Sequence, residues 1–532
     1  MEISRKEDFP MKKVKVQRTL AELIAANQTM SLYLDNLSRG RKATPHSWLY
    51  EKEEGKTDSE KAQKTLQRWI PIMEAANKKS EFGEIFNQFD LKQVEKFGPQ
   101  GAIPPFESKE VTEVLEPLYT PTEYDDASKL SHLYDDAKLF AIEAFGTKAN
   151  RCRPLALERV VDDMRARDTL STNSGFPRFI RRNTVTDIEI SDARSGRAYD
   201  YPAIILFRHY YGKLRPVWMF PMSLNLVEAQ FSQVIQKTLQ ESSAQWIQQY
   251  LQPWQGYEYV KQTLTDQWTG QQVDGGDTTK MDAHMRPAQL ELVYQIVKWL
   301  FQKQYWDELH KSLIHVCEID LLCSSNEIIV GTHGLASGSG WTQLSETVLQ
   351  LFMAWRAKVR GQGIGDDFYW ITDMSADELV DYLGEYGLPA NPSKQTVGND
   401  ELHFLQRLNH QGFFSRENSK VLGAYYPTIR ALGSMLLPEK FHKPKDWNSD
   451  MFCTRNYMIL ENCVDDPCFD EFLAFVVHGH KDMIPFAKKS DAQLAAVQRV
   501  ASKVPGLSPS YNQEKREKPL SSFVGIQLAK RF

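Results

Sequence analysis

The sequence predicts an α+β fold made of several subdomains. The chain has 532 residues, of which 42% are hydrophobic. That length exceeds the roughly 250–300 residues that one hydrophobic core serves, so more than one core is expected. Apolar residues recur at helical spacing near both ends of the chain, whereas the middle contains extended apolar runs such as 203–207 and 217–219.

The first 90 residues are expected to form helices joined by charged linkers. Residues 19–26 and 59–77 carry apolar side chains at helical spacing. Residues 98–105 are rich in Gly and Pro, which is typical of a linker. No residue pattern in this region suggests chemistry.

Residues 201–219 predict a β-hairpin that carries cations near its Tyr211-Gly212 turn. Between residues 151 and 215, Arg outnumbers Lys and aromatic residues are interleaved, as expected of a channel for single-stranded nucleic acid. A solvated charged face is the alternative. The net charge of −5 does not exclude a channel, because binding needs only local positive potential.

Two pairs of carboxylates stand out, and three of their members, Asp277, Asp366 and Asp367, are candidate metal ligands. Asp277 and Asp282 lie five positions apart, before a helix predicted from 287 to 305. Asp366 and Asp367 lie in a turn before an aromatic run. Adjacent carboxylates offer the hard oxygen ligands that Mg²⁺ prefers, although each pattern alone also fits an ordinary polar turn.

A glycine-rich loop at 334–342 lies between the two carboxylate pairs. Glycines let a ligand backbone come close, and Ser or Thr at the start of the following helix can cap it or bind a ribose or phosphate. Residues 360–364 are poor in apolar side chains, so we expect a short or irregular strand there. Residues 376–386 predict a short helix, and 314–330 predict extended structure.

In this order the motifs resemble those of viral RNA-dependent RNA polymerases. Asp-x4-Asp at 277–282, Ser-Gly-x3-Thr at 337–342 and Gly-Asp-Asp at 365–367 resemble motifs A, B and C of that family. The other motifs match in family order: G at 172–177, F at 213–218, D at 388–394 and E at 404–407. The wording of motifs A and B is most similar to the polymerases of picobirnaviruses, which are small bisegmented double-stranded RNA viruses, with partitivirus enzymes next.

The resemblance implies a right-hand polymerase fold of fingers, palm and thumb, in which an antiparallel palm sheet is backed by helices. The implied division is an N-terminal helical region at 1–90, fingers at 91–264, palm at 265–290, a fingers insert at 291–328, palm at 329–412, a helical thumb at 413–504 and a C-terminal tail at 505–532. Residues 490–493 predict a capping box before the last thumb helix.

The implied activity is that of an RNA-directed RNA polymerase, which would replicate and transcribe a viral RNA genome by two-metal nucleotidyl transfer from ribonucleoside triphosphates. Two Mg²⁺ ions, with Mn²⁺ as the alternative, would neutralise the attacking and leaving oxygens. The resemblance gives Asp277, Asp366 and Asp367 as their ligands. It gives Lys394 as the general acid for pyrophosphate.

The resemblance also implies nucleotide and RNA contacts. Lys213 and Arg215 would grip the triphosphate, and Asp282, Ser337 and Thr342 would recognise the 2′-hydroxyl. The residues implied to contact RNA are Thr172, Asn173, Ser174, Gly175, Arg208, Gly338 and Arg407. The chain departs from the family at Glu346, where most members carry Asn or Asp, so the way in which the sugar is sensed stays open.

Two rival functions stay open. A reverse transcriptase normally uses a Tyr-x-Asp-Asp turn and a bulky aromatic sugar gate, where this chain has Asp282. A non-catalytic RNA-binding virion protein that kept the fold would also explain the basic segment.

The expected partners are the RNA template, nascent RNA, ribonucleoside triphosphates and a capsid protein. We expect a monomer in the virion interior and the host cytoplasm. No apolar run approaches the ~20 residues of a membrane span, and the polar N-terminus is unlike a secretory signal. The six cysteines form no C-x-x-C pair, which argues against a zinc ribbon and favours buried structural thiols.

The last residues leave two alternatives open. A charged stretch at 511–518 precedes an apolar terminus at 519–532. Such a terminus should dock on its own protein. It would either occlude the central cavity or cover an apolar patch on the thumb.

Overall fold

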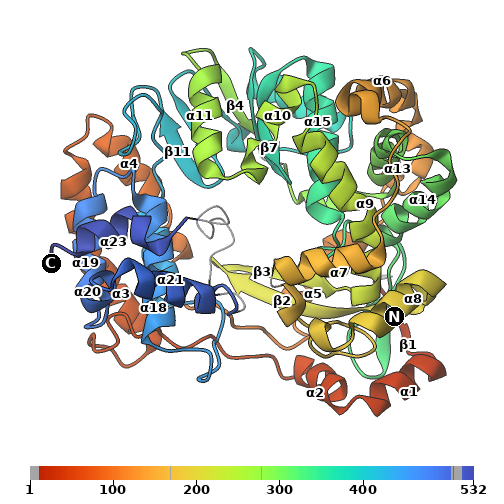
Figure 1. Ribbon diagram of the computed structural model, residues 1–532, viewed down its shortest axis with the longest axis horizontal. Helices are drawn as coiled ribbons and strands as arrows, with labels where there is room; N and C mark the ends of the chain where they lie inside the picture. Colours follow the sequence, from red (N-terminus) through yellow and green to blue (C-terminus); the bar gives the residue numbers. More distant parts are fainter. Residues whose placement is uncertain (1–10, 168, 277, 505–506, 508–517) are drawn as a thin grey trace, which may run out of the picture.

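The computed structural model describes residues 11–167, 169–276, 278–504, 507 and 518–532. Figure 1 shows the elements arranged as a ring. The C-terminal helices α18 to α23 lie on one side, the β2–β3 hairpin points toward them from the other, and strands β4, β7 and β11 lie between along the top. The combination of helices with largely antiparallel sheets confirms the α+β class.

A four-stranded antiparallel sheet carries the predicted palm motifs. Its strand order is β7 (Arg360–Ile364), β8 (Asp367–Ile371), β4 (Val273–Gly276) and β9 (Thr396–Gly398). Strands β10 (Glu401–Phe404) and β11 (Arg407–His410) form a separate hairpin. The helices of this region are α10 (Gln245–Tyr250), α11 (Tyr257–Gln267), α12 (Met281–His284), α13 (Pro287–Val297), α15 (Thr342–Ala357) and α16 (Ala376–Gly384).

The expectation of a short or irregular strand at 360–364 is wrong, because β7 pairs with β8 along its whole length. Small residues replace apolar ones here because neighbouring atoms leave no room. A Cβ added at Gly361 would lie 2.0 Å from the carbonyl oxygen of Tyr369, and one at Gly363 would lie 1.6 Å from Oε1 of Gln350. Close packing, rather than apolar side chains, therefore defines this strand.

A five-stranded sheet forms the core of the fingers. Its order is β1 (Lys12–Lys15), β6 (Glu327–Val330), β5 (Leu321–Leu322), β2 (Ala203–Tyr210) and β3 (Lys213–Met219). The predicted hairpin is confirmed, with Arg208 opposite Arg215 beside the Tyr211-Gly212 turn. The helices around this sheet are α5 (Lys109–Tyr119), α6 (Tyr134–Phe145), α7 (Leu157–Ala166), α8 (Thr186–Ser195), α9 (Met222–Gln240) and α14 (Trp306–Ile314).

Two predicted spans are shorter than expected. The helix predicted over 287–305 ends at Val297 and continues as short 3-10 turns. The extended stretch predicted over 314–330 is confirmed only at β5 and β6. The stretch begins at the last residue of helix α14, which spans 306–314 and buries apolar residues on one face.

The N-terminal region joins the fingers to the thumb. Strand β1 completes the fingers sheet, and α1 (Arg18–Ala26) and α2 (Gln28–Leu37) pack beside it. Further along, α3 (Asp58–Asn77) and α4 (Gly83–Leu91) belong to the thumb core. The buried Asp90 carboxylate accepts hydrogen bonds from the backbone N–H groups of Thr428 and Ile429, at 2.7 and 2.8 Å, where the first thumb helix begins.

The thumb is helical, as predicted. Its helices are α17 (Thr428–Leu436), α18 (Ser449–Leu460), α19 (Phe469–Val477), α20 (Met483–Ala487), α21 (Asp491–Ala501) and α23 (Val524–Ala529). The predicted capping box is confirmed at the start of α21, where Ser490 and Gln493 bond reciprocally.

The C-terminal segment packs on the thumb. Leu520, Phe523, Ile526 and Ala529 are buried in the thumb core. The Glu461 carboxylate accepts hydrogen bonds from the backbone of Val524 and Gly525. None of residues 518–532 is among those that line the cavity beside the Gly-Asp-Asp motif, so this packing favours the covering alternative, and an effect of the segment on initiation stays a prediction. Residues 508–517 of the charged stretch lie outside the described part of the chain.

Contacts between the fingertip and the thumb close the ring. The Tyr211 hydroxyl bonds to that of Ser434, and the Arg430 guanidinium lies 3.7 Å from the centre of the Tyr211 ring. Arg208 donates two hydrogen bonds to the Glu439 carboxylate, at 2.9 and 2.7 Å. The hairpin is thus held at its tip and along its edge.

Over the described residues, no helix has both the length and the apolar character needed to cross a membrane. All six cysteines are free thiols, and five are buried, which confirms the expectation of buried cysteines for those five.

The close packing of β7 generates a stability prediction. Gly361→Ala should lower the free energy of unfolding by about 1–3 kcal/mol, and with it the melting temperature. The new methyl group overlaps backbone that cannot move without breaking the β7–β8 ladder. Gly384→Ala, at the end of α16 with no atom within 4 Å of its new Cβ, is the matched control and should be neutral or slightly stabilising. Equal melting temperatures for the two variants would contradict this account.

Candidate active site

Strand pairing brings the end of β4 to the Gly-Asp-Asp turn. Gly276, the last residue of β4, lies opposite Phe368 of β8. A Cβ on Gly276 would lie 2.0 Å from the Phe368 ring, so only glycine fits. The predicted metal ligand Asp277 follows directly but lies outside the described residues, and it stays a prediction.

Helix α15 holds the turn in place. The Gly365 N–H donates to the Thr347 hydroxyl at 2.9 Å, and Gln350 donates to the carbonyl oxygens of Gly365 and Asp367 at 3.1 and 3.3 Å. Gly365 has a φ of 59°, which favours glycine. The turn leaves Asp366 exposed and Asp367 half-buried.

Four carboxyl groups gather around this turn. The side chains of Asp282, on α12, and Glu346, on α15, hydrogen-bond to each other. Burial, and then the charges of Asp282 and Asp366, raise the pKa of Glu346. Burial and the charge of Asp366 likewise raise the pKa of Asp282, against the lowering effect of Arg215.

Such a cluster suits a divalent cation. Without one, the carboxyl groups repel, and the Asp282–Glu346 hydrogen bond requires a shared proton. Oxygen-only ligands are those that Mg²⁺ prefers. Within the described residues, no three His, Cys, Asp or Glu side chains are placed to hold a metal ion together. The oxygen donors of Asp366 and Asp367 fit Mg²⁺ by type, and the third predicted ligand, Asp277, lies outside the described residues.

The glycine-rich loop docks on strand β3. The Trp218 N–H donates to the Ser337 carbonyl at 2.7 Å, and a Cβ on Gly338 would lie 2.1 Å from the Trp218 carbonyl oxygen. The Thr342 hydroxyl donates to the Ala336 carbonyl at 2.9 Å. Ser337 and Thr342 are half-buried and Gly338 is exposed, so the loop offers these residues at its surface.

The hairpin brings cations to the carboxylate cluster. The Tyr210 ring lies between two guanidinium groups, 4.7 Å from that of Arg208 and 5.0 Å from that of Arg215. Arg215 is close enough to lower the pKa of Asp282. Lys213 is exposed at the turn. The role of Arg215 in binding a triphosphate stays a prediction.

A cavity of about 530 Å³ lies in front of the Gly-Asp-Asp turn. Its walls combine the turn, α15, the hairpin and the β10–β11 hairpin with a segment that carried no motif. The cavity-lining residues are Arg208, Tyr210, Gln236, Pro253, Trp254, Gln255, Gly256, Tyr257, Val260, Gln343, Glu346, Ile364, Gly365, Asp366, Asp367, Leu405 and Arg407. Sequence reasoning missed 253–257. The available signal in the sequence was the Trp-Gln-Gly-Tyr pattern, in which aromatic residues flank a glycine. In the structure that glycine has a φ of 121°.

Some predicted RNA-contacting residues have structural partners. Ser174 is fully buried, where its hydroxyl accepts from the Ile180 N–H, and Gly175 faces the Phe220 carbonyl too closely for any Cβ. Thr172 is exposed in the same loop and Asn173 is half-buried. The Ser174 side chain therefore shapes the loop and is not available to RNA in this conformation.

Arg407 and Lys394 differ in their setting. Arg407 lines the cavity, but it donates to the Asn462 backbone and side chain at 3.1 and 2.9 Å and stacks 4.1 Å from the Tyr257 ring centre. Lys394 is exposed at the end of a 3-10 turn, Pro392–Lys394, and is not among the cavity-lining residues. Its role as general acid stays a prediction.

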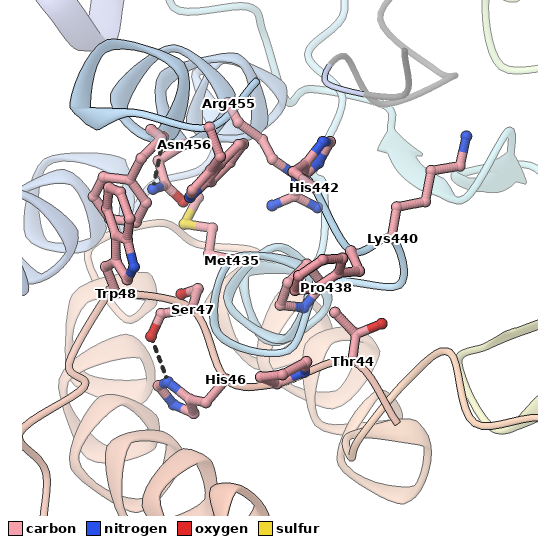
Figure 2. Close-up of a pocket in the computed structure, with 14 residues that line it drawn as sticks. Thr44, His46, Ser47, Trp48, Met435, Pro438, Lys440, His442, Arg455 and Asn456 are labelled. Carbon is pink, nitrogen blue, oxygen red and sulfur yellow. Dashed lines mark hydrogen bonds between the residues drawn. The ribbon is translucent and has the colours of Figure 1, made fainter. Parts of the chain in front are cut away.

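A second pocket, of about 170 Å³, lies between residues 44–48 and the thumb. Figure 2 shows Arg455 beside His442 on one side of it and Thr44 on another, while Lys440 extends away from the other labelled side chains. Its lining contains no Asp or Glu and no residue of motifs A to G. It therefore does not offer carboxylates for metal-dependent chemistry.

No family model matches the chain. It is 27% identical over 390 residues to the potential RNA-dependent RNA polymerase of human picobirnavirus (strain Human/Thailand/Hy005102/-), which covers 67% of this chain and 71% of that protein. It is 24% identical over 212 residues to the RNA-directed RNA polymerase of Cryptosporidium parvum virus 1 (strain KSU-1), covering 37% of this chain and 39% of that protein.

Two crystal structures of the RNA-dependent RNA polymerase of a human picobirnavirus, one of them an insertion loop deletion mutant, share the fold. Their TM-scores are 0.77 and 0.76, each at 20% identity over 97% of this chain and 100% of theirs. These likenesses confirm the predicted right-hand fold and the predicted resemblance to picobirnavirus polymerases.

The carboxylate cluster generates a prediction for stability against pH. In EDTA, Glu346→Gln should raise the melting temperature, and the gain should grow from pH 5 to pH 8. The folded-state pKa of Glu346 is raised, so the folded chain binds more protons than the unfolded chain above about pH 4.5, and wild-type stability falls as pH rises. Glutamine removes that loss.

Glu318→Gln is the control, since Glu318 is exposed and distant in sequence from the cluster. It should leave the melting temperature unchanged across the same range. A pH-independent difference between Glu346→Gln and wild type would contradict the shared-proton interpretation.

Proposed function

We propose that the chain, an RNA-directed RNA polymerase by its fold and by its similarity to picobirnavirus polymerases, joins ribonucleotides on an RNA template by two-metal nucleotidyl transfer. The observation that carries this proposal is the meeting of the Gly-Asp-Asp turn and the cationic hairpin around one cavity, with the end of β4 paired to the strand that follows the turn. Each motif is weak alone. Together they supply metal ligands, triphosphate contacts and room for nucleic acid.

The metal site would be formed by Asp366, Asp367 and Asp277. Two Mg²⁺ ions bound there, or Mn²⁺ in their place, supply charge neutralisation for the attacking 3′-oxygen and the leaving pyrophosphate. The hydrogen bonds from Gln350 and to Thr347 fix the turn before substrate arrives, so its two carboxylates need no rearrangement.

The protein side chains would orient the nucleotide. Arg215 binds triphosphate oxygens, and Tyr210 keeps its guanidinium beside the cluster. Asp282, Ser337 and Thr342 contact the ribose. Lys394 would donate a proton to pyrophosphate after movement toward the cavity. Glu346 fixes the orientation of Asp282 through their hydrogen bond.

The biological setting extends the same proposal. The chain would replicate and transcribe a viral RNA genome, with template RNA, nascent RNA and ribonucleoside triphosphates as its partners. The relatives' names, which are those of viral proteins, support this setting. Action as a monomer, association with a capsid protein, and location in the virion interior and the host cytoplasm complete the proposal.

Asp366→Asn tests the chemistry directly. The substitution keeps the shape of the turn and removes a metal-binding charge, so Mg²⁺-dependent primer extension should fall by roughly a thousandfold or more. RNA affinity should change little, and the melting temperature should not fall.

Asp373→Asn, at an exposed position just beyond β8, is the matched control and should retain extension. Extension by Asp366→Asn at more than about a tenth of the wild-type rate would refute the metal assignment. Complete inactivity of the wild type with Mg²⁺ and Mn²⁺ would favour the non-catalytic RNA-binding alternative.

Glu346→Leu tests sugar selection. It removes the hydrogen bond that orients Asp282, so the ratio of kcat/KM for a ribonucleotide to that for its deoxy analogue should fall about tenfold or more. Single-nucleotide incorporation kinetics measure this ratio, with Glu318→Leu as the control. An unchanged ratio would show that Glu346 has no part in sugar sensing, and a wild-type preference for deoxynucleotides would indicate a reverse transcriptase.

A further inference from the structure

A buried carboxylate accepts hydrogen bonds from the glycine-rich loop. Glu228, on α9, is 3% exposed. Its Oε2 atom accepts hydrogen bonds from the Ser339 hydroxyl at 2.7 Å and from the Gly340 N–H, while the Trp341 N–H donates to the Ser339 hydroxyl at 3.0 Å. A Cβ on Gly340 would lie only 3.0 Å from its Oε2, so the loop is shaped around this side chain.

The loop is therefore fixed at two points. Backbone contacts with Trp218 hold Ser337 and Gly338, as described above. Glu228 holds Ser339 and Gly340 directly, and Trp341 through the Ser339 hydroxyl. Gly338 and Gly340 are exposed, and Thr342 follows at the start of α15. The position of Ser337 and Thr342 relative to a ribose thus depends on the Glu228 carboxylate.

The same helix also reaches the 172–177 loop. Arg182 donates to the Asn173 carbonyl at 3.1 Å and to the Asn225 side chain at 2.8 Å. Asn225 lies one turn before Glu228 on α9. Arg182 is also close enough to Glu228 to lower its pKa. Helix α9 therefore supports two loops that the sequence assigned to RNA and nucleotide contacts.

The surroundings of Glu228 leave its charge only partly compensated. Burial raises its pKa to about 7, against the lowering effect of the hydrogen bonds from the loop and of the charge of Arg182. Arg182 also faces the Glu189 carboxylate. On the α14 side, the Tyr199 hydroxyl is near Glu228 and Glu308, and the Lys311 ammonium lies 4.1 Å from the Tyr199 ring centre.

We propose that Glu228 is a positioning residue for RNA synthesis, whose ionised carboxylate holds residues 339–341 so that Ser337 and Thr342 meet the ribose. The ionised carboxylate accepts both loop hydrogen bonds on Oε2, and its charge strengthens them. Protonation removes that charge and weakens both bonds. The kinetic part of this inference rests on the proposed polymerase function.

Hydrogen exchange tests the loop clamp independently of activity. Glu228→Gln keeps the volume of the side chain but removes its charge, so that a neutral amide oxygen replaces Oε2 as the acceptor for the loop. Amide exchange in peptides covering 338–342 should accelerate roughly tenfold or more at fixed pH, while peptides of α15 and β8 stay unchanged. Glu241→Gln, at the exposed end of the same helix, is the matched control and should alter none of these peptides.

Steady-state kinetics test the positioning role. Glu228→Gln should raise the apparent KM for ribonucleoside triphosphates and lower kcat at pH 8. The ratio of wild-type to variant kcat/KM should shrink as pH falls through about 7, because the wild-type carboxyl then becomes protonated too. Glu228→Asp, which keeps the charge on a shorter arm, should recover part of the activity.

The outcomes separate the possibilities. A structural role alone predicts a lower melting temperature for Glu228→Gln, whereas removal of a buried charge should leave it equal or higher. Unchanged loop exchange, or a wild-type to variant ratio that stays constant from pH 6 to 8, would overturn the proposal. Faster exchange in an enzyme that shows no polymerase activity would support the clamp and count against the proposed function instead.

Discussion

Mutual repulsion among carboxyl groups is the constraint on which the rest of the structure depends. Asp282, Glu346, Asp366 and Asp367 come from two helices and a strand turn, and two unit charges ~4 Å apart repel by about 4 kcal/mol at an effective dielectric near 20. Such a cluster persists only where several independent contacts hold the backbone in place. Here the paired strands β7, β8 and β4 and the hydrogen bonds from α15 supply that rigidity. A bound cation would be attracted by these negative charges and would offset the repulsion between them.

The second constraint is the closure of the ring. The fingertip is held to the thumb by Tyr211 and by the Arg208–Glu439 pair. Part of the basic segment is occupied by such internal contacts. Arg178, for example, pairs with Glu189 and Asp192. Other arginines of the segment, such as Arg153, Arg181 and Arg197, are exposed.

Patterns that depend on neighbours in sequence could be predicted without the structure. The hairpin at 203–219 follows from apolar runs around a Tyr-Gly turn, and the start of α21 follows from the Ser490–Gln493 capping box. The order of the motifs predicted the right-hand fold, because each motif is a short segment that can be identified from adjacent residues. Asp366, Asp367 and Arg215 were identified in the same way, and the structure places them near one another.

The sequence by itself therefore determined the fold class, the local elements and the candidate carboxylates, because these depend on residues only a few positions apart. Tertiary structure alone decided how small residues make β7 a regular strand, how residues 518–532 cover the thumb, and how Glu228 grips a loop more than a hundred residues away. It also paired Glu346 with Asp282. These features arise from close packing, burial and hydrogen bonds between distant segments. A local sequence pattern does not show which distant atoms will fill the space beside a glycine or face a buried carboxylate.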